Sequence, residues 1–323
     1  MTDLITTEPR ALAAADLYTA FADYLRLNVA EGDASENTIR AYWTHARQYA
    51  TWCYDVDIDP RAADEGTIQE YRRHLVDQEY KRDTIAAKLQ AVARLYEAMQ
   101  RRGLRTDNPA AGIKPPRNKT APEDRVKFLP LAALPRLLEL CNPSTARGWR
   151  DRAMVALMAY KGLRVAEVAA LTVDSFDLDR DPPELRVIGK GNKQRTVYLT
   201  PSIASVLTGW LNRRGAVANE DERALFVALD HRTHGGPLSA RSARRAIDDL
   251  LDRAGLKRDG ISCHSLRHTF ATWSVAGGAS IPAVSADLGH SNIATTGIYA
   301  KIADKIKGNP TAFLEAMIDD LGE

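Results

Sequence analysis

A segment without hydrophobic periodicity divides this chain of 323 residues into two parts. It reads TDNPAAGIKPPRNKTAPEDR, residues 106–125, and is rich in proline, glycine and charge. Such a composition favours a linker or an extended strap. Each flanking part is long enough to bury a core of its own. We therefore expect a first domain at 1–112, a linker at 113–127 with the boundary near residue 118, and a second domain at 128–323.

The two parts differ in their pattern of apolar residues. In the first part, residues 35–54 and 83–102 each carry an apolar stripe at helical spacing. In the second part, residues 184–199, ELRVIGKGNKQRTVYL, read as two short strands around the turn-forming GKGN. We predict a mainly α fold with a small antiparallel β-sheet. Further helices are expected at 150–161, from 164 onward, and at about 202–213, 240–254, 265–276, 281–288 and 311–321.

Composition argues against several classes of protein. No apolar run approaches the roughly 20 residues of a membrane span, and the N-terminus lacks the basic start and apolar core of a signal peptide. The three cysteines lie far apart without a CxxC pair, so neither a disulfide framework nor a zinc knuckle is indicated. We expect a cytoplasmic protein with no membrane association, no metal and no other cofactor.

Charge is unevenly distributed along the chain. Residues 81–119 hold ten Lys and Arg against three acids, a local net charge of +7, whereas residues 302–323 hold two lysines against five acids, a net of −3. Such segregation suits a polyanion partner at the first segment and a protein partner at the second. A solvated helix face would give the same basic pattern, so charge alone leaves both interpretations open.

Four motifs of the second part carry side chains that can act on a phosphate group. They are GLRVAEV, with an arginine at a helix start; IGKGNKQR, with a lysine at a hairpin tip; HSLRH; and LGHSNIATTGIY. Each residue has an ordinary structural explanation when taken alone, such as a solvated arginine, a capping histidine or a half-buried tyrosine. The candidates that these motifs supply are Arg164, Lys190, His264, Arg267, His290 and Tyr299.

The last motif raises a geometric question. In one unbroken helix, His290 and Tyr299 would lie on opposite faces, because nine residues at about 100° each turn the chain by two and a half turns. However, Gly289 is a natural helix stop, Ser291 or Asn292 a natural N-cap, and Gly297 a further weak point. We expect the chain to bend twice here, which allows the two side chains to converge.

The HSLRH motif also has a metal-binding interpretation. His264 and His268 have the i, i+4 spacing of a zinc-binding helix. The metalloprotease helix carries a glutamate beside its first histidine, whereas this chain has Ser265 there, and Cys263 is the only other obvious ligand nearby in the sequence. A metal site is therefore the weaker interpretation.

Taken together, the six candidates describe one kind of chemistry. Two guanidinium groups with histidine donors can neutralise a phosphodiester as it becomes pentacoordinate. Tyrosine supplies a nucleophilic oxygen that leaves a covalent phosphoester. Lysine can protonate a departing 5′-oxygen, and no metal is required.

These motifs, in this order, resemble those of the tyrosine recombinase (phage integrase) family, and most closely its Xer-type members. The segments ENTIRAYWTHARQYATWC and TIAAKLQAVARLYEAM resemble helices of the family's core-binding, SAM-like domain. The resemblance implies a C-shaped clamp on duplex DNA, formed by the helical core-binding domain and the mixed α/β catalytic domain. It also implies four protomers on two sites with inverted-repeat half-sites, either a homo-tetramer or a hetero-tetramer with a second recombinase. Strand exchange through a Holliday junction would need neither ATP nor metal.

The resemblance assigns a role to each catalytic candidate. Tyr299 would form a 3′-phosphotyrosyl bond, and two arginines would hold the scissile phosphate. The two histidines would assist proton transfer from the tyrosine and donate to a non-bridging oxygen, and the lysine would protonate the 5′-oxygen. The two arginines are Arg164 and Arg267, and the lysine is Lys190. His264 would assist the proton transfer, and His290 would donate to the non-bridging oxygen. For DNA contacts in the first domain, we expect Arg40, Arg47, Lys81 and Lys88.

Two other classes of protein remain as alternatives. SIPAVSADLGHSNIATTGIYA can be interpreted as the helix-turn-helix of a DNA-binding regulator, and a type IB topoisomerase or telomere resolvase would use a similar site. Within the family, helical patterning begins near residue 13, so we expect no arm-binding domain. This favours a simple recombinase, acting in chromosome or plasmid dimer resolution or in the integration and excision of a mobile element.

Overall fold

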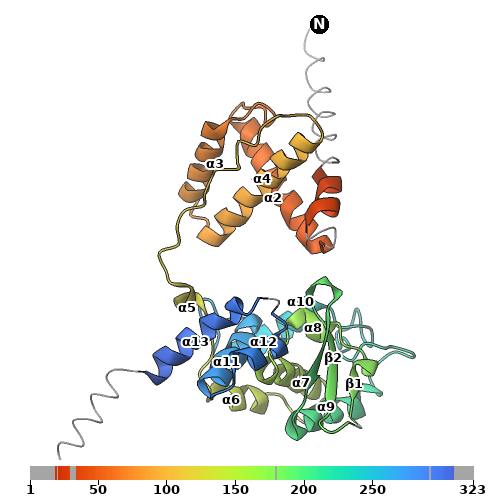
Figure 1. Cartoon of the computed structure of the whole chain (residues 1–323). Coiled ribbons are helices and arrows are strands. Elements are labelled where there is room, and N and C mark those ends of the chain that lie inside the picture. The colour runs from red at the N-terminus through yellow and green to blue at the C-terminus, as the bar shows by residue number, and fades with distance from the viewer. Residues whose placement is uncertain (1–18, 20, 30–33, 179, 291, 309–323) are drawn as a thin grey trace, which may run out of the picture. The chain divides into compact units, whose positions relative to one another are not determined.

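The structure, a computed structural model, describes residues 19, 21–29, 34–178, 180–290 and 292–308. The chain separates into two compact units, and the division falls between Lys119 and Thr120 (Figure 1). This position lies inside the segment expected to be a linker. The helix expected at 311–321 lies outside the described residues.

The described part of the first unit is helical. After a helix at residues 21–28 come α2, α3 and α4, of which α2 and α3 both contact α4 (Figure 1). Ser35 caps α2, since its hydroxyl accepts the Thr38 N–H, and Asp64 caps α3 by accepting the Thr67 N–H. The two predicted apolar stripes line the core of the unit. The bounds are Glu36–Asp55 for α2, Glu65–Asp77 for α3 and Arg82–Arg101 for α4.

The second unit is built around the helix α7, Ala146–Tyr160, which is buried along most of its length and packs against α9 and α11. Most of the expected helices are present within one or two residues at each end. The other helices are α5 Pro122–Arg125, α6 Ala133–Glu139, α8 Val165–Ala169, α9 Pro201–Arg214, α10 Ala240–Arg253, α11 Cys263–Ala276, α12 Ile281–Leu288 and α13 Ala294–Lys307.

The predicted hairpin belongs to a three-stranded antiparallel sheet. Its strands are β1 Phe176–Asp177, β2 Glu184–Ile188 and β3 Gln194–Tyr198, in the order β1-β2-β3. Leu185 pairs with Val197, and both are buried, so one face of the hairpin packs on the core. The tip is the turn η3, Lys190–Asn192, where Gly191 adopts φ +70°. This left-handed conformation suits glycine and explains the GKGN sequence.

Part of the expected linker is folded onto the second unit. Residues 122–125 form α5, and Lys305 of α13 donates to Asp124 over 2.8 Å. Val126 packs on a small apolar cluster around Tyr299. The sequence did not indicate this short helix, because its four residues are too few to show a hydrophobic period.

None of the helices among the described residues combines the length and the apolar character needed to cross a bilayer.

Candidate active site

Arg164 stands at the start of α8, immediately after a sharp turn. Gly162 makes this turn with φ +66°, and a Cβ there would lie 2.5 Å from the ring of Phe270. The backbone N–H of Arg164 donates to Oε2 of Glu167 over 2.9 Å, and its Nη1 donates to Oε1 over 2.8 Å. Glu167 therefore fixes both the backbone and the side chain of Arg164.

Arg267 is a buried residue of α11, with 2% of its surface exposed. Its Nη1 donates to the carbonyl of Gly162 over 2.6 Å, and its Nη2 donates to the carbonyl of Leu288 over 2.7 Å. Burial, together with the nearby charge of Arg164, lowers the pKa of Arg267 to about 10, so the guanidinium remains charged at neutral pH. Arg267 thus joins the turn before Arg164 to the end of α12.

His290 makes two contacts through its two ring nitrogens. Nε2 lies 2.9 Å from Nη2 of Arg267, and Nδ1 lies 2.9 Å from the hydroxyl of Thr296. Burial and the charges of Arg267 and Arg164 lower the pKa of His290 to about 4, which makes the ring neutral at pH 7. An arginine can only donate, so Nε2 is the acceptor, and Nδ1 carries the proton and donates to Thr296. In this arrangement His290 has no free N–H for a phosphate oxygen.

The chain turns between α12 and α13, where Gly289 was expected to end one helix and Ser291 or Asn292 to begin the next. α12 ends at Leu288, and Gly289 follows with φ +64°. Asn292 then accepts the N–H of Ala294 over 2.9 Å at the start of α13. The further weak point expected at Gly297 does not interrupt α13, because Gly297 lies within that helix. The break between the two helices brings His290 and Tyr299 to Arg267 and His268, which are neighbouring residues of α11.

Tyr299 is buried, and its hydroxyl lies 2.8 Å from Nδ1 of His268. Burial raises the pKa of Tyr299, while the charges of Arg267 and Arg164 oppose this rise. Burial, with the neighbouring ring of His264 and the charge of Arg267, lowers the pKa of His268 to about 4. At pH 7 a neutral imidazole therefore faces a protonated phenol, which is the arrangement of a base and a latent nucleophile.

His268 was not among the catalytic candidates, and His264 was. The His264 ring packs edge-on against the His268 ring at 4.7 Å between centroids, so His268 stands between His264 and Tyr299. Burial and the charges of Arg267 and Arg164 lower the pKa of His264. The HSLRH motif contained the signal for His268, but its spacing suggested zinc. Among the described residues, no group of three or more His, Cys, Asp or Glu side chains is placed to bind a metal ion.

Two further residues of the site were missed by sequence reasoning. Arg195 of β3 donates to both oxygens of Glu167, over 3.1 and 3.0 Å, and its Nε donates to the carbonyl of Asp287 over 3.0 Å. Burial alone would raise the pKa of Glu167, but the hydrogen bonds from Arg195 and from the Arg164 backbone outweigh it, so the pKa lies below its ordinary value.

Lys190, the candidate lysine, is the first residue of the hairpin turn η3.

The DNA-binding candidates of the first unit fall into two groups. Arg40, Arg47 and Lys81 are exposed on or beside α2 and α4. Lys88 has 3% of its surface exposed, and its ammonium lies 4.6 Å from the centre of the Tyr80 ring. The ammonium also donates to Gln48, and burial lowers the pKa of Lys88.

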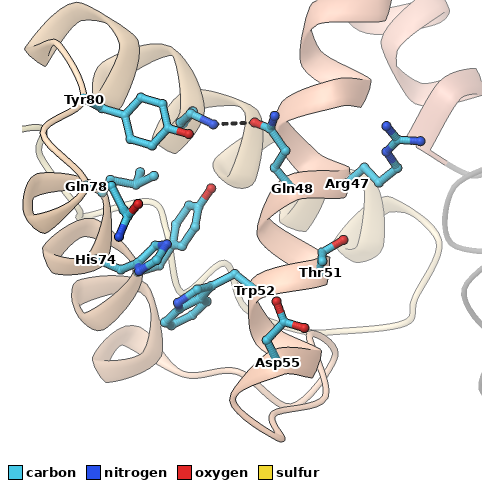
Figure 2. Close-up of a pocket in the computed structure, with 11 residues that line it drawn as sticks. Arg47, Gln48, Thr51, Trp52, Asp55, His74, Gln78 and Tyr80 are labelled. Atoms are coloured by element: carbon cyan, nitrogen blue, oxygen red, sulfur yellow. Dashed lines mark hydrogen bonds between the residues drawn. The ribbon is translucent and has the colours of Figure 1, made fainter.

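Lys88 and Gln48 border a pocket of about 540 Å³ between α2, α3 and α4, which also includes Trp52, His74 and Tyr80 (Figure 2). The amine of Lys88 is thus used inside the unit. This buried position does not fit the DNA contact that we expected of Lys88.

Comparison with known proteins agrees with this geometry. Residues 127–305 match the phage integrase family, and residues 19–103 match the phage integrase N-terminal SAM-like domain. Tyrosine recombinase XerD of Corynebacterium glutamicum is 33% identical over 285 residues, which cover 86% of this chain and 91% of that protein. Tyrosine recombinase XerC of Myxococcus xanthus is 34% identical over 220 residues, 67% of this chain and 71% of that protein.

Two solved structures share the fold at low sequence identity. The XerH site-specific recombinase, in a post-cleavage complex with palindromic difH substrate, aligns with a TM-score of 0.69 at 18% identity, over 93% of this chain and 96% of that chain. The Tn1549 transposon integrase, in complex with a circular intermediate DNA, aligns with a TM-score of 0.66 at 15% identity, over 88% and 94%.

The family match covers more than half of the chain, and a relative above 30% identity covers most of it. The protein belongs to the phage integrase family of tyrosine recombinases. It is a site-specific recombinase of the Xer-like kind, an enzyme that cleaves and rejoins DNA strands.

Proposed function

We propose that Tyr299 is the nucleophile of this recombinase and that it attacks the scissile phosphate to form a 3′-phosphotyrosyl bond, freeing a 5′-hydroxyl. The observation that carries this proposal is the 2.8 Å contact between the Tyr299 hydroxyl and Nδ1 of His268. The residue next to His268, Arg267, is the buried cation of the same helix. One helix therefore presents a proton acceptor and a phosphate-binding charge side by side.

Arg164 and Arg267 bind the scissile phosphate in this proposal. In the described structure, three of the five N–H groups of Arg267 donate hydrogen bonds, to Gly162, Leu288 and His290. These contacts fix the guanidinium before substrate arrives, so little reorganisation is needed as charge develops on the pentacoordinate phosphorus. For His290 to donate to a non-bridging oxygen, Arg267 must first release Nε2 or the ring must gain a proton.

We assign the proton transfers from the pKa values and the positions of the residues in the site. His268, neutral at pH 7, accepts the phenolic proton of Tyr299 as the tyrosine oxygen attacks. His264 lies one ring further along the same helix and assists this transfer. Lys190, at the hairpin tip, protonates the 5′-oxygen as it leaves. The reverse steps rejoin the strand, and the covalent bond to Tyr299 conserves the energy that rejoining requires.

The DNA substrate is a duplex with inverted-repeat half-sites. Arg40, Arg47 and Lys81 contact this duplex. Four protomers, all of this chain or shared with a second recombinase, exchange strands between two sites through a Holliday junction. Similarity to XerD and XerC supports chromosome or plasmid dimer resolution, and the fold shared with a transposon integrase keeps mobile-element integration as the second candidate. The reaction would take place in the cytoplasm.

The test uses a nicked duplex that traps the covalent intermediate. Tyr299→Phe removes only the attacking oxygen, so the variant should bind the duplex with unchanged affinity and form no adduct that survives denaturation. Tyr198→Phe is the matched control, because Tyr198 is 55% exposed on β3 and should form adduct normally. Adduct at the level of the unmodified protein in Tyr299→Phe would contradict the assignment.

A further inference from the structure

Arg195 links three segments that carry candidate catalytic residues. It belongs to β3, the strand that follows the turn containing Lys190. Its two terminal nitrogens bind Glu167, the residue that holds Arg164. Its Nε binds the carbonyl of Asp287, three residues before His290. The side chain of Arg195 thus contacts α8, which follows Arg164, and the last turn of α12, which precedes His290. Its backbone belongs to the hairpin that carries Lys190.

Two glycines make room for this side chain. A Cβ at Gly189 would lie 3.3 Å from Nη1 of Arg195, and a Cβ at Gly289 would lie 2.9 Å from the same atom. The second distance is closer than two such atoms normally approach. The guanidinium therefore passes between the base of the hairpin and the end of α12, where a larger residue on either side would displace it.

The ion pair between Arg195 and Glu167 is favoured because Glu167 is a buried carboxylate. Glu167 is 5% exposed and ionised, and such a buried carboxylate requires compensating charge. Arg164 alone supplies one side-chain bond from a guanidinium that is 35% exposed, whereas Arg195 is 14% exposed and supplies two. Loss of Arg195 would leave Glu167 with the weaker of its two cationic partners.

Arg195 also marks the point where the hairpin leaves the protein core. Leu185, Val187 and Val197 are buried, whereas Ile188, Lys193 and Gln194, which lie closer to the tip, are exposed. Gly189 N–H donates to the carbonyl of Lys193 over 2.8 Å and closes the turn. At this point the Arg195 side chain donates hydrogen bonds to two other elements of the unit, α8 and α12.

We propose that Arg195 is a positioning residue that sets the place of the Lys190 hairpin relative to Arg164 and His290. The inference rests on the proposed function insofar as Lys190 is the general acid. Arg195 itself does not touch the substrate. It acts by holding the hairpin, through Glu167 and Asp287, at the position from which the lysine reaches the leaving oxygen.

The first experiment measures adduct formation by Arg195→Ala on two nicked duplexes, one ordinary and one with a 5′-bridging phosphorothiolate, whose sulfur leaves without a proton. On the ordinary duplex the rate should fall on the order of 10²-fold, the cost of a misplaced catalytic group. On the phosphorothiolate it should recover to within about threefold of the unmodified protein, as it should in Lys190→Ala. Arg195→Lys, which cannot bind both oxygens of Glu167, should fall between.

The matched control is Arg186→Ala. Arg186 lies on β2 of the same hairpin and donates to the carbonyl of Asp174 over 2.6 Å, but it has no contact with Glu167 in the described structure. This variant should cleave both duplexes like the unmodified protein. If phosphorothiolate rescues Lys190→Ala but leaves Arg195→Ala as slow as before, then Arg195 does not act through the hairpin and the proposal is wrong.

The second experiment does not depend on the chemistry. Amide hydrogen exchange should become faster in Arg195→Ala at two places, residues 187–194 and residues 286–290, where the Gly289 and His290 amides donate to Ala286 and Ser285. Arg186→Ala should leave residues 286–290 unchanged. Exchange in both segments at the unmodified rate would refute the positioning role. If instead exchange rises as expected while Lys190→Ala is not rescued, the positioning role stands and the assignment of Lys190 as general acid fails.

Discussion

The buried pair of His268 and Tyr299 makes the second unit sensitive to acid. In the unfolded chain His268 titrates near 6.5, whereas in the folded protein its pKa is about 4. A folded pKa below the unfolded one means that the unfolded state binds the proton first as pH falls. The free energy of unfolding should therefore be unaffected by His268 above about pH 6.5, and it should decrease as pH falls from there toward 4.

The size of the effect follows from these two pKa values. Between pH 7 and pH 5, His268 alone should lower the free energy of unfolding by about 2 kcal/mol. Replacing it by glutamine, which does not titrate, should remove that part of the pH dependence. At pH 7 the two proteins should differ little in this respect, although the substitution alters packing at every pH, so the slope is the quantity to compare.

The assay is urea unfolding followed by tryptophan fluorescence at pH 7 and at pH 5. Replacing Trp43 and Trp52 by phenylalanine removes both tryptophans of the first unit and confines the signal to the second unit. The control is His234→Gln, since His234 is exposed and should leave the slope unchanged. If His268→Gln shows the same loss of stability between pH 7 and pH 5 as the unmodified protein, His268 is not held neutral beside Tyr299 and the proton-transfer argument fails.

Three further predictions concern DNA binding, the turn and metals. Lys81→Ala should reduce the slope of log binding constant against log salt by roughly one, as expected for one lost phosphate contact. Lys88→Ala should leave that slope unchanged, because Lys88 is buried. Equal effects of the two variants in filter binding would contradict the burial of Lys88. Gly289→Ala should lower the melting temperature and the adduct rate together, because φ is +64° and the new Cβ would lie 2.9 Å from Arg195; normal adduct formation would argue against the close approach. Excess EDTA should leave adduct formation unchanged, and its loss would return HSLRH to a metal site.

Local patterns predicted most of the elements and the identity of the motifs. The apolar stripes at 35–54 and 83–102 correspond to α2 and α4, and the GKGN turn lies at the tip of the β2–β3 hairpin. These features depend on residues close together in the chain. The break after α12 was also predictable, since Gly289 needs a left-handed backbone conformation that glycine adopts readily.

What the sequence could not predict depends on contacts between distant segments. Lys88 looked like a surface cation, but its ammonium donates a hydrogen bond to Gln48, 40 residues earlier, inside the unit. Arg195 had no local signal, because its partners lie 28 and 92 residues away. Gly297 suggested a bend, yet α13 continues through it, and the packing of α13 on α11 outweighs the low helix propensity of one glycine.

The burial of Arg267 has a practical consequence for making inactive forms of the enzyme. This arginine satisfies the carbonyls of Gly162 and Leu288, two groups far apart in the sequence. Its removal would leave both carbonyls without their donor, so an Arg267 variant would disturb the fold in addition to removing the phosphate contact proposed for this residue. Tyr299→Phe deletes a single oxygen and leaves these carbonyls bound. On the role proposed for Tyr299, Tyr299→Phe is therefore the better inactive variant for mapping target sites on DNA, because it keeps the contacts of Arg267 in place.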